Sequence, residues 1–399
     1  MDDFKTQSGI ASWLYEADMG QDDLLSRFKA QVEQTTSSQD VPHAQSILHN
    51  VPVYDGEAVR KLAPDTKKRR ALLAEWTDVL AKGAGVFAIR NGMDNIAVLD
   101  EATSIFSQII EAEKSGAGGG GDHFAKAGAN DRIWNALEKH CQANAHNFAH
   151  YYSNDTIAMA AEAWLGRGYQ MTAQVNRVNP GGEAQKPHRD YHLGFMQADQ
   201  TLAFPAHAHA LSASLTLQGA IAHCDMPIES GPTQLLPFSQ HLLEGYLAVG
   251  KPAFQTYFAE HYVQIPLQKG DMVFFNPALM HAAGSNISSD IYRMANLLQI
   301  SSAFGRAMET VNRQKLCVLL YSVLAQAKSD HTLSDLAIRN VIAASAEGYS
   351  FPTNLDRDPP IGGLAPKTQA QFMQDGLAAG IPEAELSDQL EQLRLRQQS

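Results

Sequence analysis

The strongest constraint on the fold is a series of short apolar segments in the middle of the chain, separated by turns rich in Gly, Pro and Asn. Two of these segments alternate apolar and polar side chains with a period of two, as half-buried antiparallel strands do. The expected strands are residues 170–178, 211–218, 262–265, 272–275 and 293–300. Many short strands with turns between them are typical of a sandwich or barrel, jelly rolls included.

The segments on either side of this series are mainly helical by their apolar spacing. The expected helices are residues 57–81, 98–113, 133–150, 157–165, 315–327, 333–344 and 383–396, and residues 86–89 form a short strand. We therefore predict an α+β protein with three regions. A helical region at 1–165 packs on a double-stranded β-helix (jelly-roll, cupin-like) core at 166–304, and a helical extension follows at 305–399.

Composition excludes several classes of function. The 399 residues are 44% hydrophobic and 19% charged, which describes an ordinary globular protein. A net charge of -12 argues against nucleic acid or an anionic membrane as the main partner. We find no signal peptide and no apolar run of the roughly 18 residues that a membrane helix needs. Three widely spaced cysteines predict no disulfide framework, so we expect a cytoplasmic protein.

A glycine-rich run at residues 116–121 invites comparison with a phosphate-binding loop. The spacing G-x-x-x-x-G-K-[ST] is absent, and no apolar strand precedes the run. We interpret it as a flexible loop or lid.

Two His-x-Asp pairs are candidate metal ligands, His188 with Asp190 and His223 with Asp225. In an extended segment, side chains two residues apart project to the same side and can share one metal ion. Either pair alone is a weak signal in a chain with 15 His. Two ligands also leave a divalent metal under-coordinated, so another ligand must come from elsewhere.

His281 is our candidate for the third ligand, because it follows the buried strand 272–275. Two His and one carboxylate on one face of the metal are the ligands of non-haem Fe(II) oxygenases, with zinc as the usual competitor. Arg293 opens the next strand, and its guanidinium can hold a carboxylate through two hydrogen bonds. A keto-acid cosubstrate that chelates the metal needs such an anchor for its distal carboxylate.

The order of these motifs resembles the phytanoyl-CoA dioxygenase family of Fe(II)- and 2-oxoglutarate-dependent oxygenases. The resemblance covers about residues 165 to 302. It rests on His188-Arg189-Asp190, the segment Gly231-Pro232 to Pro237-x-Ser239-x-His241, Gly270-Asp271 with its apolar strand, His281, Asn286 and Arg293.

The resemblance implies a set of roles. His188, Asp190 and His281 hold iron, Arg293 binds 2-oxoglutarate, and O2 is the second cosubstrate. Asn179 matches an Asn that binds 2-oxoglutarate in one branch of the family, although its distance from His188 differs. His223 and Asp225 match a strand end that has no metal role. The expected reaction is hydroxylation of a small molecule with release of succinate and CO2.

The substrate is not specified by any cluster of basic residues. Candidate pocket residues are Gln174, Tyr191, His192, Phe195 and Gln218. We expect no nucleic acid or membrane partner, and we expect any homo-oligomer to form through the C-terminal helices. Two alternatives stay open: a non-catalytic binding protein with a cupin-like fold, or a metal-dependent hydrolase or isomerase on the same fold.

Overall fold

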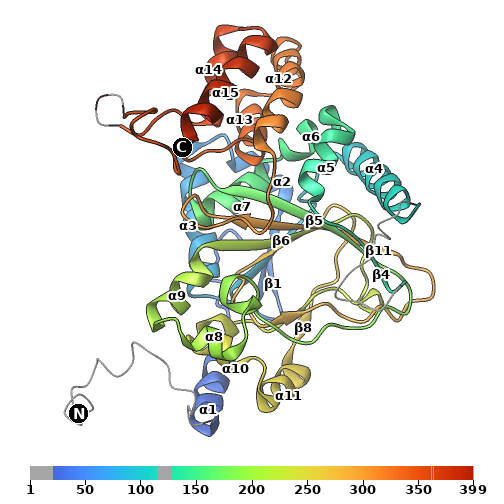
Figure 1. The fold of residues 1–399 in the computed structure, drawn as a ribbon. Helices are drawn as coiled ribbons and strands as arrows, with labels where there is room; N and C mark the ends of the chain where they lie inside the picture. Colours follow the sequence, from blue (N-terminus) through green and yellow to red (C-terminus); the bar gives the residue numbers. More distant parts are fainter. Residues whose placement is uncertain (1–20, 116–127, 361, 363, 399) are drawn as a thin grey trace, which may run out of the picture.

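The computed structural model describes residues 21–115, 128–360, 362 and 364–398 (Figure 1). The glycine-rich run at 116–121 lies outside the described residues. In the part of the chain that is described, every helix is too short or too polar to cross a membrane.

Two β-sheets form the centre of the described structure. The large sheet has eight strands in the order β1-β2-β3-β9-β6-β11-β5-β4, and the small sheet has three in the order β10-β7-β8. Except for the parallel pair β2 and β3, the neighbouring strands are antiparallel. The strands of the large sheet are β1 Ser46–Leu48, β2 Val51–Asp55, β3 Val86–Arg90, β9 Met272–Phe275, β6 Thr216–Ala222, β11 Arg293–Ser301, β5 Gln170–Val178 and β4 Asn130–Ile133. Those of the small sheet are β10 His281–Ala282, β7 Gln234–Leu235 and β8 Val263–Gln264.

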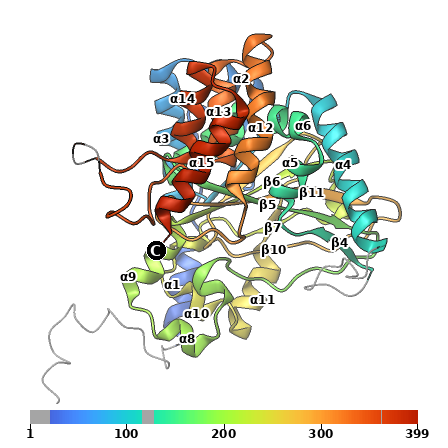
Figure 2. The ribbon, with the colours of Figure 1, turned by 45° about the horizontal axis from the view of Figure 1, so that its top comes forward.

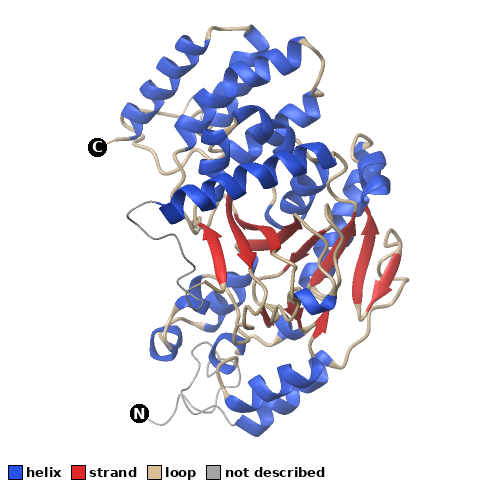
Figure 3. Cartoon of the chain, turned by 90° about the vertical axis from the view of Figure 1, so that its right-hand side faces the viewer, coloured by secondary structure: helices blue, strands red, loops and turns tan. Residues whose placement is uncertain are grey.

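Most of the long helices cover one face of the large sheet, as Figures 1 and 3 show. They come from both ends of the chain, and the C-terminal helices pack against α5, α6 and α7 (Figure 2). The helices on this side are α2 Gly56–Leu62, α3 Thr66–Ala81, α4 Ile96–Ser115, α5 Ala136–Ala143, α6 Ala145–Tyr152, α7 Asp155–Leu165, α12 Arg313–Ser329, α13 Asp335–Ser345, α14 Gln369–Ala379 and α15 Glu383–Gln397. The elements on the opposite side are α1 Gln21–Val32, α8 Ala198–Leu202, α9 Ala206–Ser214, α10 Gly245–Ala248, α11 Pro252–His261, and the short 3-10 helices η2 His192–Phe195, η3 Ile228–Ser230 and η4 Ser239–His241.

The alternation of side chains along β11 explains why the large sheet has a hydrophobic core on each of its faces. Met294, Leu298 and Ile300 point into the core between the large sheet and the helices. Ala295 and Leu297 point the other way and pack against the core that includes Val273, Phe275 and Leu235. Because successive side chains of a strand face opposite sides, one strand contributes to both cores.

Strands from the first 165 residues complete the large sheet. β3 pairs with β9, and β4 pairs with β5. β5 therefore lies between β4 and β11. We assigned residues 130–132 to no element and expected a helix from residue 133, so β4 was not predicted.

Three predicted elements differ from the structure. The strand expected at 211–218 begins only at Thr216, because Ala206–Ser214 forms helix α9. The helix expected at 133–150 is divided, because Asn135 has φ 51° and Asn144 is extended and caps α6. The helix expected at 57–81 is divided where Asp65 caps α3 by accepting hydrogen bonds from two backbone N–H groups.

Candidate metal centre

His188 and His281 are brought together by a short piece of antiparallel pairing. The backbone N–H of His188 donates to the carbonyl of His281 at 2.9 Å, and the N–H of His281 donates back at 3.1 Å. The two rings lie with centroids 4.5 Å apart. A hydrogen-bonded backbone pair therefore joins two residues that are far apart in the sequence.

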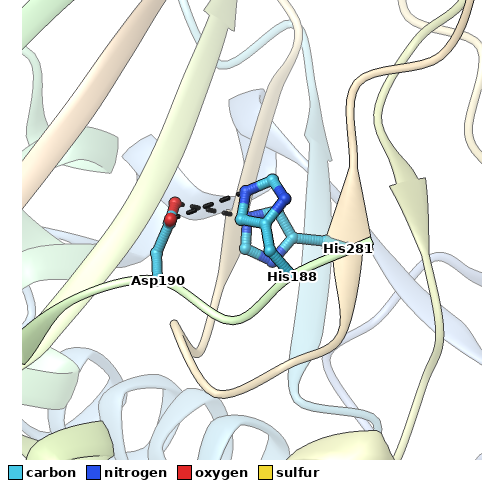
Figure 4. A group of neighbouring side chains, drawn as sticks. All are labelled: His188, Asp190 and His281. Atoms are coloured by element: carbon cyan, nitrogen blue, oxygen red, sulfur yellow. Dashed lines mark ion pairs between the residues drawn. The ribbon is translucent and has the colours of Figure 1, made fainter. Parts of the chain in front are cut away.

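Asp190 completes the group, as Figure 4 shows. Its Oδ1 lies 3.5 Å from Nε2 of His188, and its Oδ2 lies 3.4 Å from Nε2 of His281. One ligand atom from each residue lies within 4.8 Å of the others, and no second group of this kind occurs among the described residues. Ligands at right angles on a metal at about 2.1 Å are separated by about 3 Å, so small movements would let all three bind one ion.

Both imidazoles present the same nitrogen to Asp190. Nδ1 of His188 bonds to the carbonyl of Lys186, and Nδ1 of His281 bonds to the carbonyl of Leu279, each at 2.8 Å. A carbonyl only accepts, so each Nδ1 carries a proton, and Nε2 is the nitrogen that can bind a metal once it is deprotonated. This is the tautomer that a metal ligand needs.

The carboxyl group of Asp190 is held ionised. Burial alone would raise its pKa, but His281, His188 and Gln218 outweigh burial and lower the pKa well below its usual range. The Gln218 side chain donates to Oδ2 at 2.5 Å, and the backbone N–H of Asp190 donates to the carbonyl of Pro277. The donor set of two neutral imidazoles and one carboxylate fits a divalent iron.

Arg189 explains why its two neighbours face the same side. Its buried guanidinium points away from the centre and donates to the carbonyls of Ser239 and Leu242. The ring of Tyr246 lies 5.5 Å from this guanidinium. With residue 189 anchored on one side, residues 188 and 190 project to the other.

The centre opens into a cavity of about 800 Å³. The three candidate ligands all line it, together with Arg293, Gln218 and apolar side chains of both sheets. This volume lies within the usual range for small-molecule sites.

Arg293 is a buried cation without an acidic partner. It is 7% exposed, and its guanidinium donates to the carbonyl of Ser230 at 3.1 Å. In the described part of the chain no carboxylate forms an ion pair with it. Burial lowers its pKa to about 10, so the group is charged at neutral pH. A buried charge of this kind is costly unless a counter-charge binds, so the position suits an anionic ligand such as a carboxylate.

Gly231 allows the chain to approach closely enough to place the Ser230 carbonyl. It has φ 71°, and a Cβ atom there would lie 2.3 Å from the carbonyl oxygen of Ser285. Only glycine fits both the left-handed backbone and this close approach. The Gly-Pro turn noted in the sequence therefore shapes the wall beside Arg293.

Asn179 does not reach the cavity. Its amide donates to the carbonyl of Gly128 at 3.0 Å and faces Asp131. Asn176, three residues earlier on β5, lines the cavity instead, and its buried Oδ1 has no hydrogen-bond partner in the part of the chain that the structure describes. The position of Asn179 gives no support to the expected cosubstrate role, because its side chain is used to hold the segment before β4.

The five residues expected in the substrate pocket divide into two groups. Gln174, Phe195 and Gln218 line the cavity. Tyr191 is 2% exposed and donates to Oε1 of Gln299, and neither it nor His192 is among the lining residues. Both have positive φ, 67° and 45°, where the chain turns into η2 directly after Asp190.

Sequence reasoning missed one wall of the cavity. It consists of Arg132, Trp134, Asn176, Met308 and Glu309. The first two lie on or just after β4, which we did not predict, and the last two lie in the loop after β11. A basic and an aromatic residue two apart, Arg132 and Trp134, were the available signal that this segment is extended.

The fold and the centre define a class: a protein with a buried two-His, one-carboxylate site that opens into a cavity between two β-sheets. The family model described as phytanoyl-CoA dioxygenase (PhyH) matches residues 78–295, and the chain belongs to this family. Enzymes of the family use Fe(II), 2-oxoglutarate and O2, so this is a non-haem iron, 2-oxoglutarate-dependent enzyme. The match begins within α3, well before the region where the motifs alone suggested it.

Solved structures of low identity resemble the chain. The non-heme alpha ketoglutarate dependent epimerase SnoN from nogalamycin biosynthesis is 17% identical, with a TM-score of 0.41, over 59% of this chain and 82% of that chain. The carbocyclase SnoK from the same biosynthesis is 18% identical, with a TM-score of 0.41, over 57% and 83%. A structure of SnoN with Fe3+, alpha ketoglutarate and nogalamycin RO is 16% identical, with a TM-score of 0.39, over 59% and 85%. No curated protein matches the chain.

Proposed function

We propose that the enzyme hydroxylates a small molecule, with iron held by His188, Asp190 and His281 and with 2-oxoglutarate anchored on Arg293. In this reaction one oxygen atom of O2 enters the substrate C–H bond and the other enters succinate, while 2-oxoglutarate loses CO2. We also propose that the two sheets are the halves of a double-stranded β-helix. The observation that carries the proposal is that three converging ligand atoms line the same cavity as a buried guanidinium that pairs with no carboxylate among the described residues.

The residues around the iron site would orient the reactants and exclude water. The ring of Phe275 packs against His281 with centroids 4.8 Å apart, and Gln218 fixes the Asp190 carboxylate. Bound iron with 2-oxoglutarate supplies the oxidising power, and the protein supplies position and a dry site. Asp190 also supports hydroxylation, because its carboxylate occupies the ligand position that halogenating relatives leave to chloride.

The test is anaerobic addition of Fe(II) and 2-oxoglutarate to the full-length protein. We expect a visible charge-transfer band, followed by release of succinate when air is admitted. His188→Ala should abolish both signals, whereas His331→Ala, which removes an exposed imidazole after α12, should keep them.

The two alternatives predict different results. A non-catalytic binding protein would give the band but no succinate above the rate of free iron. A metal-dependent hydrolase or isomerase would bind metal without consuming 2-oxoglutarate, and Arg293→Ala would leave its activity unchanged. Absence of the band in the native protein would contradict the proposed function.

A further inference from the structure

The wall formed by β4, β5 and the loop after β11 lies at a distance from Arg293. On β11, Arg293 is opposite Val178 of β5, and Leu297 is opposite Gln174. Four residues of a strand span about 13 Å. Gln174 therefore marks a part of the cavity that 2-oxoglutarate bound to Arg293 would leave free for another molecule.

The side chains of this wall combine an aromatic ring with planar polar groups. Arg132 donates to Oε1 of Gln174 at 3.0 Å, and its guanidinium lies 5.0 Å from the ring of Trp134. Met308 contacts the amide of Gln174 through its sulfur. Such a surface offers apolar contact to a ring or chain and hydrogen bonds at its edge.

Glu309 places an unsatisfied acceptor in this wall. Its Oε1 accepts a hydrogen bond from the backbone N–H of Asn135 at 2.6 Å. The Gln174 amide also interacts with the carboxyl group and opposes the effect of burial on its pKa, although no well-formed hydrogen bond reaches the buried Oε2 from the described residues. Burial raises the pKa of the carboxyl group, which shows that it lacks full solvation. A buried acceptor of this kind is costly unless a ligand donates to it.

Gln218 places a second acceptor close to the metal centre. Its amide nitrogen donates to Asp190 and also faces Oε1 of Gln299, so its orientation is set by two acceptors. Its Oε1 is consequently buried and accepts no hydrogen bond from any residue that the structure describes. Because 2-oxoglutarate carries only acceptors, it cannot satisfy either oxygen.

The charges nearby favour a neutral donor over a cation. Arg132 and Lys139 both act on the Glu309 carboxyl and oppose the effect of burial on its pKa. Lys186 also lines the cavity. An ammonium group would add a further positive charge beside these residues, whereas a hydroxyl group donates without adding charge.

We propose that this wall binds a neutral, hydroxyl-bearing substrate whose apolar face packs on Trp134 and Met308. One hydroxyl donates to Oε2 of Glu309, and a second donates to Oε1 of Gln218, beside the iron site. The proposal rests on the proposed function in one respect, because it assumes that the reacting molecule shares the cavity with iron and 2-oxoglutarate.

The test measures binding to the full-length protein without turnover. Four probes share a phenyl ring and a three-carbon chain: 3-phenylpropane-1,2-diol, methyl 3-phenylpropyl ether, 3-phenylpropylamine and 3-phenylpropanoate. Ligand-observed NMR titrations give their dissociation constants, with 2-oxoglutarate present to occupy the Arg293 end. We expect the diol to bind about tenfold more tightly than the ether, which only accepts hydrogen bonds, and more tightly than the amine and the acid.

Glu309→Gln makes the test specific. The backbone N–H of Asn135 would retain the amide oxygen, so an NH2 group would replace the free acceptor. We expect the preference for diol over ether to fall at least about fivefold. The matched control Glu260→Gln, at an exposed position on α11, should leave the preference unchanged. Quenching of tryptophan fluorescence by the diol should disappear in Trp134→Phe.

Each outcome decides the proposal. Equal binding of diol and ether, tightest binding of the amine or the acid, or an unchanged preference in folded Glu309→Gln would overturn it. If Glu309→Gln does not fold by circular dichroism, the ratio of diol to ether in the native protein decides alone. A diol preference without succinate formation would contradict the proposed function only, and succinate formation without a diol preference would contradict this inference only.

Discussion

The two His-x-Asp segments of the chain share a motif but lie in different environments. At His188 and Asp190, both side chains line the cavity and converge with His281. At His223, the ring is buried on the helix-covered side, where Thr103 bonds to Nδ1 at 2.8 Å and Tyr151 bonds to Nε2 at 2.9 Å. Asp225 accepts a hydrogen bond from the backbone of Lys269.

The two environments differ in whether a ring nitrogen remains available to bind a metal. In His188 and His281, only Nδ1 is hydrogen-bonded to a nearby backbone carbonyl, and Nε2 faces the carboxylate of Asp190. In His223, both ring nitrogens are already hydrogen-bonded to hydroxyl groups. Burial is common to both sites. The candidate metal centre differs from the His223 site because each of its imidazoles has a ring nitrogen that faces another candidate ligand.

The largest expected effect is on iron binding. His188→Ala should weaken Fe(II) binding by more than about 100-fold, beyond the usual effect of losing a residue that only supports a ligand. His223→Leu should leave the affinity within about twofold, because its ring lies on the other side of the sheet. Anaerobic Fe(II) titration measures both, and comparable losses in the two variants would remove the distinction between the segments.

Stability should respond in the opposite way. His223→Leu removes the partner of two buried hydroxyl groups, on Thr103 and Tyr151, and we expect a loss of about 2 kcal/mol in the free energy of unfolding. His188→Ala should cost less, since no other side chain relies on it for a hydrogen bond. Urea denaturation of the metal-free proteins would show this, and a greater loss for His188→Ala would contradict it.

Gln218→Leu tests the residue that orients the carboxylate ligand. Removing its hydrogen bond to Asp190 should weaken Fe(II) binding about tenfold, which is typical for a group that supports a metal ligand. Gln108→Leu, at an exposed position on α4, is the control. An unchanged affinity in Gln218→Leu would show that the backbone alone positions Asp190.

Low pH should destabilise the protein because it protonates buried His rings on the helix-covered side of the large sheet. Burial lowers the pKa of His223 to about 3 and that of His140 to about 4, from 6.5 for an ordinary His. Stability due to the neutral rings is therefore complete above pH 6.5 and is lost as the pH falls toward these values. Each ring contributes about 1.4 kcal/mol per pH unit in that window. Denaturation at several pH values should give wild type a steeper loss than His223→Leu, and equal slopes would contradict the assignment.

The smallest expected effect separates Asn176, which lines the cavity, from Asn179, which does not. Asn176→Ala should raise the dissociation constant of 2-oxoglutarate about fivefold, the effect of one hydrogen bond. Asn179→Ala should leave it unchanged, because that amide is bonded to Gly128 outside the cavity. Titration of the charge-transfer band measures both constants, and a larger effect at Asn179 would restore the expectation drawn from the family.

Local sequence patterns were sufficient to predict the bounds of some strands. Residues 170–178 and 272–275 were predicted with the bounds that the structure has, because their alternation or apolar character matches one sheet position throughout. Residues 211–214 alternate in the same way, but they form the end of α9. Four alternating residues do not exclude a helix, so the tertiary context decided there.

In the candidate site as well, some residues could be predicted from the sequence and others could not. His188, Asp190, His281 and Arg293 could be proposed from motif order, since residue type and spacing carry chemical information. The wall with Arg132, Trp134 and Glu309 could not, because none of its residues belongs to a motif and β4 was not predicted. Asn179 was selected by its match to the family, whereas the pairing of β5 with β4 and β11 places Asn176 at the cavity.

The amino-acid sequence by itself determined the kinds of ligand available, their order along the chain and the strands that flank them, because these depend on residue chemistry and short-range periodicity. The motif order favoured His188 with Asp190 over His223 with Asp225, but only the tertiary structure shows the physical difference between the two pairs. That difference lies in the backbone pairing between His188 and His281 and in which ring nitrogens are already bonded, and both are set by contacts between distant parts of the chain.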